Sequence, residues 1–242
     1  MLFSLFALAA FTAVSAAVCA RTLRLAAVTK KPPELLIGLS TLLQLLGYAA
    51  MVIAAAATVG PPPRAVVEGG AIFVDVGFVV EVAFVWVVFR RGEPWARLFA
   101  MTLALACLAM PVYNHLVPWH DGVPSAAAPR AVVRSLCYGW AAFEAFRYAC
   151  LMRRRVAFGL AEPIFASRFF WWGTGSLAAA LMHDSLTMGG AVYVQGAEGS
   201  HPFFWGGATF GLISAVSFWL SFFPPTAYKQ YVERRARPSG AA

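Results

Sequence analysis

The sequence predicts an all-α integral membrane protein, and its composition and its long apolar runs are the observations behind that prediction. Apolar residues make up 60% of the 242 residues and charged residues only 12%. Soluble domains contain about 45–50% apolar and about 25% charged residues. This composition excludes a soluble globular domain, a disordered chain and a small secreted domain held by disulfides. The net charge of +8 indicates basic loops that contact anionic lipid, and no nucleic-acid partner is expected.

Seven apolar segments are long enough to cross a bilayer, which requires about 20 residues in a helix. They are residues 2–20, 35–58, 71–89, 98–116, 131–151, 164–183 and 203–224. We expect them to form one seven-helix domain, residues 1–225, followed by a short basic tail, residues 226–242. The first run has no basic residues before it, so it is predicted to be a span and not a signal peptide.

Proline marks several of the predicted helix boundaries, because it breaks helices internally but is tolerated in their first turn. It occurs at residues 32–33, 61–63 and 224–225. A proline next to an acidic residue also precedes the second and the sixth predicted helix, at residues 31–34 and 162–163. This similarity suggests a 3+1+3 arrangement of the seven helices.

Basic residues are distributed unevenly between the two sides of the predicted bundle. Three fall on the side of the N-terminus: Arg64, Arg130 and Arg134. Fifteen fall on the opposite side: Arg21, Arg24, Lys30, Lys31, Arg90, Arg91, Arg97, Arg153, Arg154, Arg155, Arg168, Lys229, Arg234, Arg235 and Arg237. Because basic loops remain in the cytoplasm, we expect the N-terminus outside and the C-terminus inside. The Arg- and Ala-rich composition suggests a bacterial inner membrane.

Three polar side chains are predicted to share one layer near the middle of the membrane. At about 1.5 Å per residue, Glu81 lies roughly 15 Å and Glu144 roughly 20 Å from the outer ends of their helices. Gln44 reaches a similar depth from the opposite direction, and Tyr48 lies one turn further along the same polar stripe. Arg147 is three residues from Glu144 and can pair with it. Ionisable groups at this depth are costly and often functional, so these five residues are the candidate ligand or ion pathway. A purely structural polar clamp is the alternative.

Two further groups are predicted to be structural. Asp75 and Arg134 lie at similar shallow depths and form a candidate ion pair. Gly207, Gly211 and Ala215 repeat at four-residue spacing on the last predicted helix, and such a ridge of small residues allows close helix packing.

Histidines cluster near the predicted outer ends of the helices and give a candidate metal site. His115, His120, His183 and Asp184 could together hold a divalent metal ion on the outer face. Interfacial histidines without a metal are the alternative. A retinal cofactor is not expected, because the three lysines all fall at or beyond the ends of the predicted helices. No hydrolase or phosphate-binding motif is present either, so the sequence gives no indication of an enzyme.

These features favour a sensory or receptor-like module that binds a small ligand, ion or proton in the polar layer. Because the predicted tail is too short for an output domain, a cytoplasmic partner would receive the signal. A channel or proton-coupled carrier that uses the same layer is the first alternative. A structural subunit of a larger membrane complex is the second. The ligand and the oligomeric state are left open by the sequence.

Overall fold

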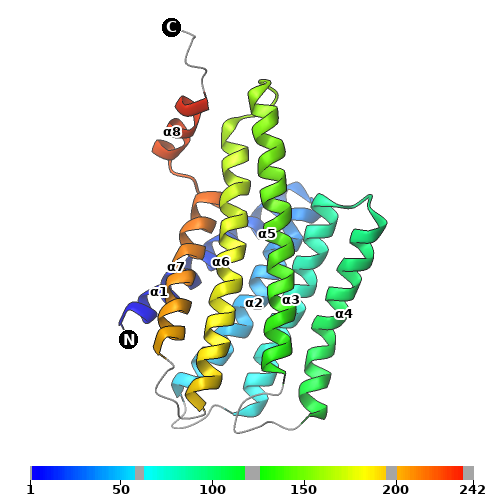
Figure 1. Ribbon diagram of the computed structural model, residues 1–242, viewed down its shortest axis with the longest axis vertical. Coiled ribbons are helices and arrows are strands. Elements are labelled where there is room, and N and C mark those ends of the chain that lie inside the picture. Colours follow the sequence, from blue (N-terminus) through cyan, green and yellow to red (C-terminus); the bar gives the residue numbers. More distant parts are fainter. Residues whose placement is uncertain (1, 58–62, 118–125, 195–200, 237–242) are drawn as a thin grey trace.

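The computed structural model describes residues 2–57, 63–117, 126–194 and 201–236, and these form eight helices (Figure 1). The helices are α1 (Leu2–Thr29), α2 (Pro32–Ala57), α3 (Arg64–Phe89), α4 (Pro94–Leu116), α5 (Ala127–Ala157), α6 (Pro163–Val194), α7 (His201–Phe222) and α8 (Thr226–Ala236). The described residues contain no β-strand. The all-helical prediction is therefore confirmed. The sequence-based segments are shorter than most of these helices, because the end turns contain charged or small residues that lower the local hydropathy.

Five helices, α1, α2, α3, α4 and α7, are long and apolar enough to cross a membrane. Large apolar side chains on their outer surfaces support the same environment. On α4, Leu98 is 67% exposed and Leu105 is 65% exposed. Extended apolar surfaces are rare on soluble proteins but are expected where lipid covers the surface. The chain is therefore an integral membrane protein by composition and helix length.

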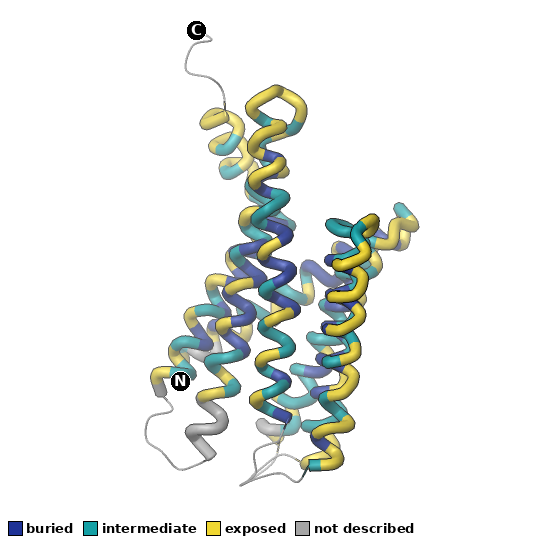
Figure 2. Tube along the Cα trace, turned by 45° about the vertical axis from the view of Figure 1, so that its right-hand side comes forward, coloured by how far each residue is buried: buried dark blue, intermediate teal, exposed yellow. Residues whose placement is uncertain are grey.

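The contacts between the long helices close a ring, and α4 lies outside it, at the edge of the bundle in Figure 1. Contacts run from α1 to α2, α2 to α3, α3 to α5, α5 to α6, α6 to α7 and α7 back to α1. α4 packs against the outside of α3 and α5. Buried residues follow the inward sides of the helices (Figure 2). The ring thus consists of two runs of three consecutive helices, α1–α3 and α5–α7.

The interface between α2 and α3 is unusually close because glycines form it. A Cβ atom added to Gly47 would collide with the backbone carbonyl oxygen of Gly70. A Cβ atom on Gly77 would lie 2.7 Å from Cγ of Gln44 and 3.1 Å from the carbonyl oxygen of Ser40. Glycine at these positions therefore allows the two backbones to approach, which places the polar residues of α2 against α3.

The basic tail predicted at residues 226–242 contains a helix that was not predicted from the sequence. Its residues Thr226–Ala236 form the short helix α8. The C-terminal turns of α5 and the first turns of α6 extend beyond the end of α3, on the same side as α8 (Figure 1). The basic residues Arg153, Arg154 and Arg155 belong to this extension.

Candidate functional site

A large cavity occupies the centre of the helix ring. Its volume is about 810 Å³, and residues of α1, α2, α6 and α7 form most of its wall. α3 contributes Glu81, and α5 contributes Arg134 and Tyr138. Most of the other side chains in the wall are apolar, including Trp172 and Trp205. A concave, mostly apolar cavity with a few convergent polar groups is the usual form of a small-molecule site.

A hydrogen-bonded chain of side chains links three helices at this cavity. Gln44 Nε2 donates to Glu81 Oε2 at 2.9 Å and to Ser40 Oγ at 3.1 Å. The Tyr138 hydroxyl donates to Gln44 Oε1 at 2.9 Å. The Gln44 amide therefore joins the carboxyl of α3 to the phenol of α5. The sequence-based pairing of Gln44 with Glu81 in one layer agrees with this geometry, whereas Tyr138 was missed because tyrosine within an apolar run gives no distinct signal.

Aromatic rings cover one side of this polar group. The His183 ring lies 5.1 Å from the Tyr48 ring and 5.5 Å from the Tyr138 ring, measured between centroids. His183 Nδ1 is 2.7 Å from the carbonyl oxygen of Ala179. Because a carbonyl can only accept, Nδ1 is the protonated nitrogen, and Nε2 of a neutral ring is left as an acceptor. The Tyr48 hydroxyl is buried and has no hydrogen-bond partner among the described residues.

A buried acidic residue with two arginines lies at the edge of the cavity. Arg134 Nη2 is 2.8 Å from Asp75 Oδ1, and Arg130 Nε is 3.0 Å from Asp75 Oδ2. Asp75 is 1% exposed. The Arg134 guanidinium also lies 5.7 Å from the centre of the Phe78 ring. The structure thus places the predicted partners Asp75 and Arg134 together and adds Arg130, which was expected only on the outer side of the bundle.

Glu144 lies in a second polar cluster, apart from Gln44 and Glu81. Its side chain is fully buried, and its Oε1 accepts a hydrogen bond from Arg90 Nε at 2.7 Å. Arg147 Nη1 lies 3.3 Å from the other oxygen. Glu144 and Arg147 are not part of the cavity wall. The expected common layer of Gln44, Glu81 and Glu144 was therefore wrong for Glu144, because α5 is displaced along its axis relative to α3 and aligns Glu144 with the end of that helix.

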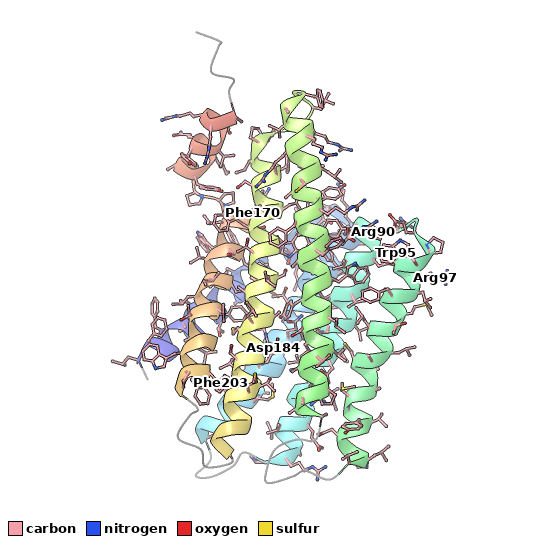
Figure 3. The ribbon with its side chains drawn as sticks, in the orientation of Figure 1. Arg90, Trp95, Arg97, Phe170, Asp184 and Phe203 are labelled. Atoms are coloured by element: carbon pink, nitrogen blue, oxygen red, sulfur yellow. The ribbon has the colours of Figure 1, made fainter. Side chains whose placement is uncertain are left out.

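Arg90 connects this cluster to the segment between α3 and α4. Its Nη1 lies 2.7 and 2.8 Å from the two oxygens of Glu93, and its guanidinium carbon lies 5.1 Å from the Trp95 ring centre. Figure 3 shows Arg90, Trp95 and Arg97 at this end of the bundle. The hydrogen bonds from Arg90 lower the pKa of the Glu93 carboxyl below its ordinary value of 4.5.

The predicted metal-site residues lie in different environments. His115 is exposed at the end of α4, whereas His183 is buried beside the cavity and not at the outer surface. Both oxygens of Asp184 lie 2.8 Å from the Ser135 hydroxyl. His120 lies outside the described residues. Within the described residues, no group of three or more His, Cys, Asp or Glu side chains is arranged to hold a metal ion.

The predicted ridge of small residues on α7 faces α6. A Cβ atom on Gly207 would lie 2.8 Å from Cδ2 of Leu186, and one on Gly211 would lie 3.1 Å from Sδ of Met182. Ala215 is 2% exposed. The ridge is therefore used for packing within the bundle.

Comparison with known proteins gives no further assignment. No family model matches the chain, and neither a curated protein nor a solved structure shows significant similarity to it.

Proposed function

We propose that this protein is a receptor-like membrane module whose central cavity binds a small, mostly apolar ligand. The ligand would have one cationic or hydrogen-bond-donating group directed toward Glu81. The environment of Glu81 is the observation that supports this proposal. Asp75 and Glu144 each contact two arginines, but Glu81 receives a hydrogen bond only from the Gln44 amide and has no ion pair among the described residues. A donor group on a ligand would offset the cost of burying this carboxyl.

The chemistry of the wall defines the ligand class further. Apolar rings and aliphatic side chains from α1, α6 and α7 would contact the body of the ligand. His183 Nε2 supplies an acceptor. The Tyr48 hydroxyl, which has no partner among the described residues, supplies a donor or an acceptor beside it. An elongated amine or alcohol of low polarity matches this arrangement better than an anion does.

The proposed orientation places the N-terminus outside and the C-terminus in the cytoplasm of a bacterial inner membrane, with seven crossings. The excess of basic residues at the α8 end of the bundle supports this orientation. In this proposal α5 and α6 also span the membrane, since each packs along a neighbouring helix of the ring. A cytoplasmic partner would contact the extended ends of α5 and α6, which would shift when ligand binding alters helix packing.

A binding measurement with a defined probe tests the proposal. A dansyl-labelled alkylamine is titrated into purified protein, and energy transfer from Trp172 and Trp205 in the cavity wall reports occupancy. We expect saturable binding that Ser15→Trp, which fills the cavity from α1, abolishes. Glu81→Gln should lower the affinity for the dansyl alkylamine by about tenfold. It should leave the affinity for the matching dansyl alcohol nearly unchanged. Binding that neither substitution affects would contradict the proposed site.

A proton-coupled carrier is the second candidate, and the same observation favours it. A carboxyl without a cationic partner inside a membrane protein is suited to gain and lose a proton during transport. Proton flux into proteoliposomes distinguishes the two functions. A carrier requires flux that Glu81→Gln abolishes, whereas a receptor binds the probe without any flux.

A further inference from the structure

A second cavity lies at the end of the bundle, between the last turn of α3 and the first turns of α4. Its volume is about 410 Å³. Its wall is formed by one residue of α3, by the α3–α4 connection and by α4: Trp86, Arg91, Gly92, Glu93, Pro94, Arg97, Leu98 and Met101. Because the spans of α3 and α4 end at Phe89 and begin at Pro94, this cavity lies at the level of the lipid headgroups. It is independent of the central cavity.

The arginines of this cavity wall carry positive charge that no described carboxylate neutralises. Arg91 and Arg97 are exposed, and neither forms an ion pair with a carboxylate among the described residues. Glu93 is the only acidic residue in the wall, and its two oxygens already contact Arg90 and the Trp95 indole nitrogen. The two arginines are therefore available to an anion that enters from outside.

The surface below the cavity is apolar. Leu98 and Met101 belong to the wall, and Leu105, Leu108 and Val112 continue at helical spacing along the exposed side of α4. Because α4 lies outside the ring, its exposed side faces lipid along its whole length. A molecule that fills the cavity with an anionic group can therefore extend acyl chains along α4.

We propose that this cavity binds the headgroup of an anionic phospholipid, with Arg91 and Arg97 contacting its phosphate groups. Two features together identify a lipid: the arginine pair at headgroup level and the apolar stripe directly below it. Arginine is suited to this role because its planar guanidinium donates two parallel hydrogen bonds to phosphate oxygens. Each basic residue near the membrane surface raises the affinity for acidic lipid by about fivefold.

Native mass spectrometry of the full-length protein with phosphatidylglycerol or phosphatidylcholine tests this inference. The wild-type protein should retain phosphatidylglycerol preferentially. Arg91→Gln combined with Arg97→Gln should reduce that preference about tenfold or more, and lysine at both positions should restore part of it. The matched control is Arg154→Gln with Arg155→Gln, which removes the same charge from the exposed end of α5 and should leave the preference nearly unchanged.

Each other outcome would overturn the inference. An equal loss in both double variants would show a diffuse charge effect and no defined site. No loss in the Arg91 and Arg97 variant would show that these residues do not bind the headgroup. Displacement of phosphatidylglycerol by inorganic phosphate at equal concentration would show an anion site that does not recognise the lipid. Because both arginines are exposed, the variants are expected to fold, which their elution in size-exclusion chromatography and their melting temperature will verify.

Discussion

The buried carboxyls of the bundle differ in what surrounds them. Asp75 and Glu144 are each held between two arginines, whereas Glu81 contacts the neutral amide of Gln44. Burying a charge is costly, and removing one partner from a buried pair leaves the other uncompensated. Replacing each carboxyl by the neutral amide should therefore change the unfolding free energy by different amounts.

Neutralising Glu144 should destabilise the protein far more than neutralising Glu81. Glu144→Gln removes the carboxylate partner of Arg147 and leaves Arg90 with Glu93 alone, and we expect a loss of about 3 kcal/mol in unfolding free energy. In Glu81→Gln the new side-chain carbonyl can still accept the hydrogen bond from Gln44, so the loss should stay below about 1 kcal/mol. Denaturant titration in detergent measures both. Glu233→Gln, on the exposed surface of α8, is the control and should have no effect. Equal losses for Glu81 and Glu144 would contradict the assigned difference.

Glu93 should make stability depend on pH in the acidic range. Its pKa is lower in the folded protein than its ordinary value of 4.5, because Arg90 donates hydrogen bonds to the ionised form. The stabilising contribution is therefore complete above about 4.5 and is lost as the pH falls through the folded-state pKa. Between pH 6 and pH 3 the melting temperature of the wild type should fall more than that of Glu93→Gln. The prediction fails if the two proteins respond equally.

An ion pair could be predicted from the sequence only where its two residues were close in the chain or at equal depth in the membrane. Glu144 and Arg147 satisfy the first condition, and Asp75 and Arg134 satisfy the second. The pairing of Arg90 with Glu144 was missed because Arg90 was counted as a basic residue of a loop. In the structure, Arg90 Nε lies 2.7 Å from Glu144 Oε1. Depth along one helix can be derived from residue number, but the displacement of one helix along another depends on packing that the sequence does not display.

Between elements, the glycine contact of α2 with α3 determines how the central polar group is assembled. It allows Gln44 to lie beside Gly77 and to reach Glu81, one turn further along α3. The sequence gave no indication that Gly47 contacts Gly70, because a glycine contact requires knowledge of both crossing helices. Each predicted apolar segment overlaps one of the helices α1 to α7, because hydropathy and proline boundaries are local signals, but α8 was not predicted.

Gly47→Ala should be strongly destabilising, and Gly139→Ala should not. A methyl group on Gly47 would collide with the carbonyl oxygen of Gly70, a backbone atom that can move only if the helices separate. We expect a loss of about 2 kcal/mol or more. The same substitution at Gly139 in α5 meets no atom within 4 Å and should be neutral or stabilising by up to about 1 kcal/mol, because alanine favours the helix. Thermal unfolding in detergent compares the two. Similar melting temperatures would show that the α2–α3 contact is looser than described.

At the scale of the whole molecule, the closed ring explains why the cavity lies at its centre. α2 and α6 face each other across the ring without forming a helix–helix interface, and the space between them is the cavity that Tyr48 and His183 border. The order of helices around the ring could not be derived from the sequence, because all the apolar faces are similar. The contacts join α1, α2 and α3 on one part of the ring and α5, α6 and α7 on the other.

Cys150 offers a direct test of the proposed orientation. All four cysteines are described, and Cys150 is the one that is exposed. It lies on α5 between Arg147 and Arg153, about 9 Å beyond Glu144 at 1.5 Å per residue. A membrane-impermeant maleimide should therefore label Cys150 in inverted membrane vesicles and not in intact cells, and Cys150→Ser should abolish labelling. Labelling of intact cells would reverse the orientation, and labelling of neither would mean that this turn of α5 is buried in the bilayer. Because a receptor with a cytoplasmic partner requires the ends of α5 and α6 to lie in the cytoplasm, the first of these outcomes would also exclude the proposed route of signalling.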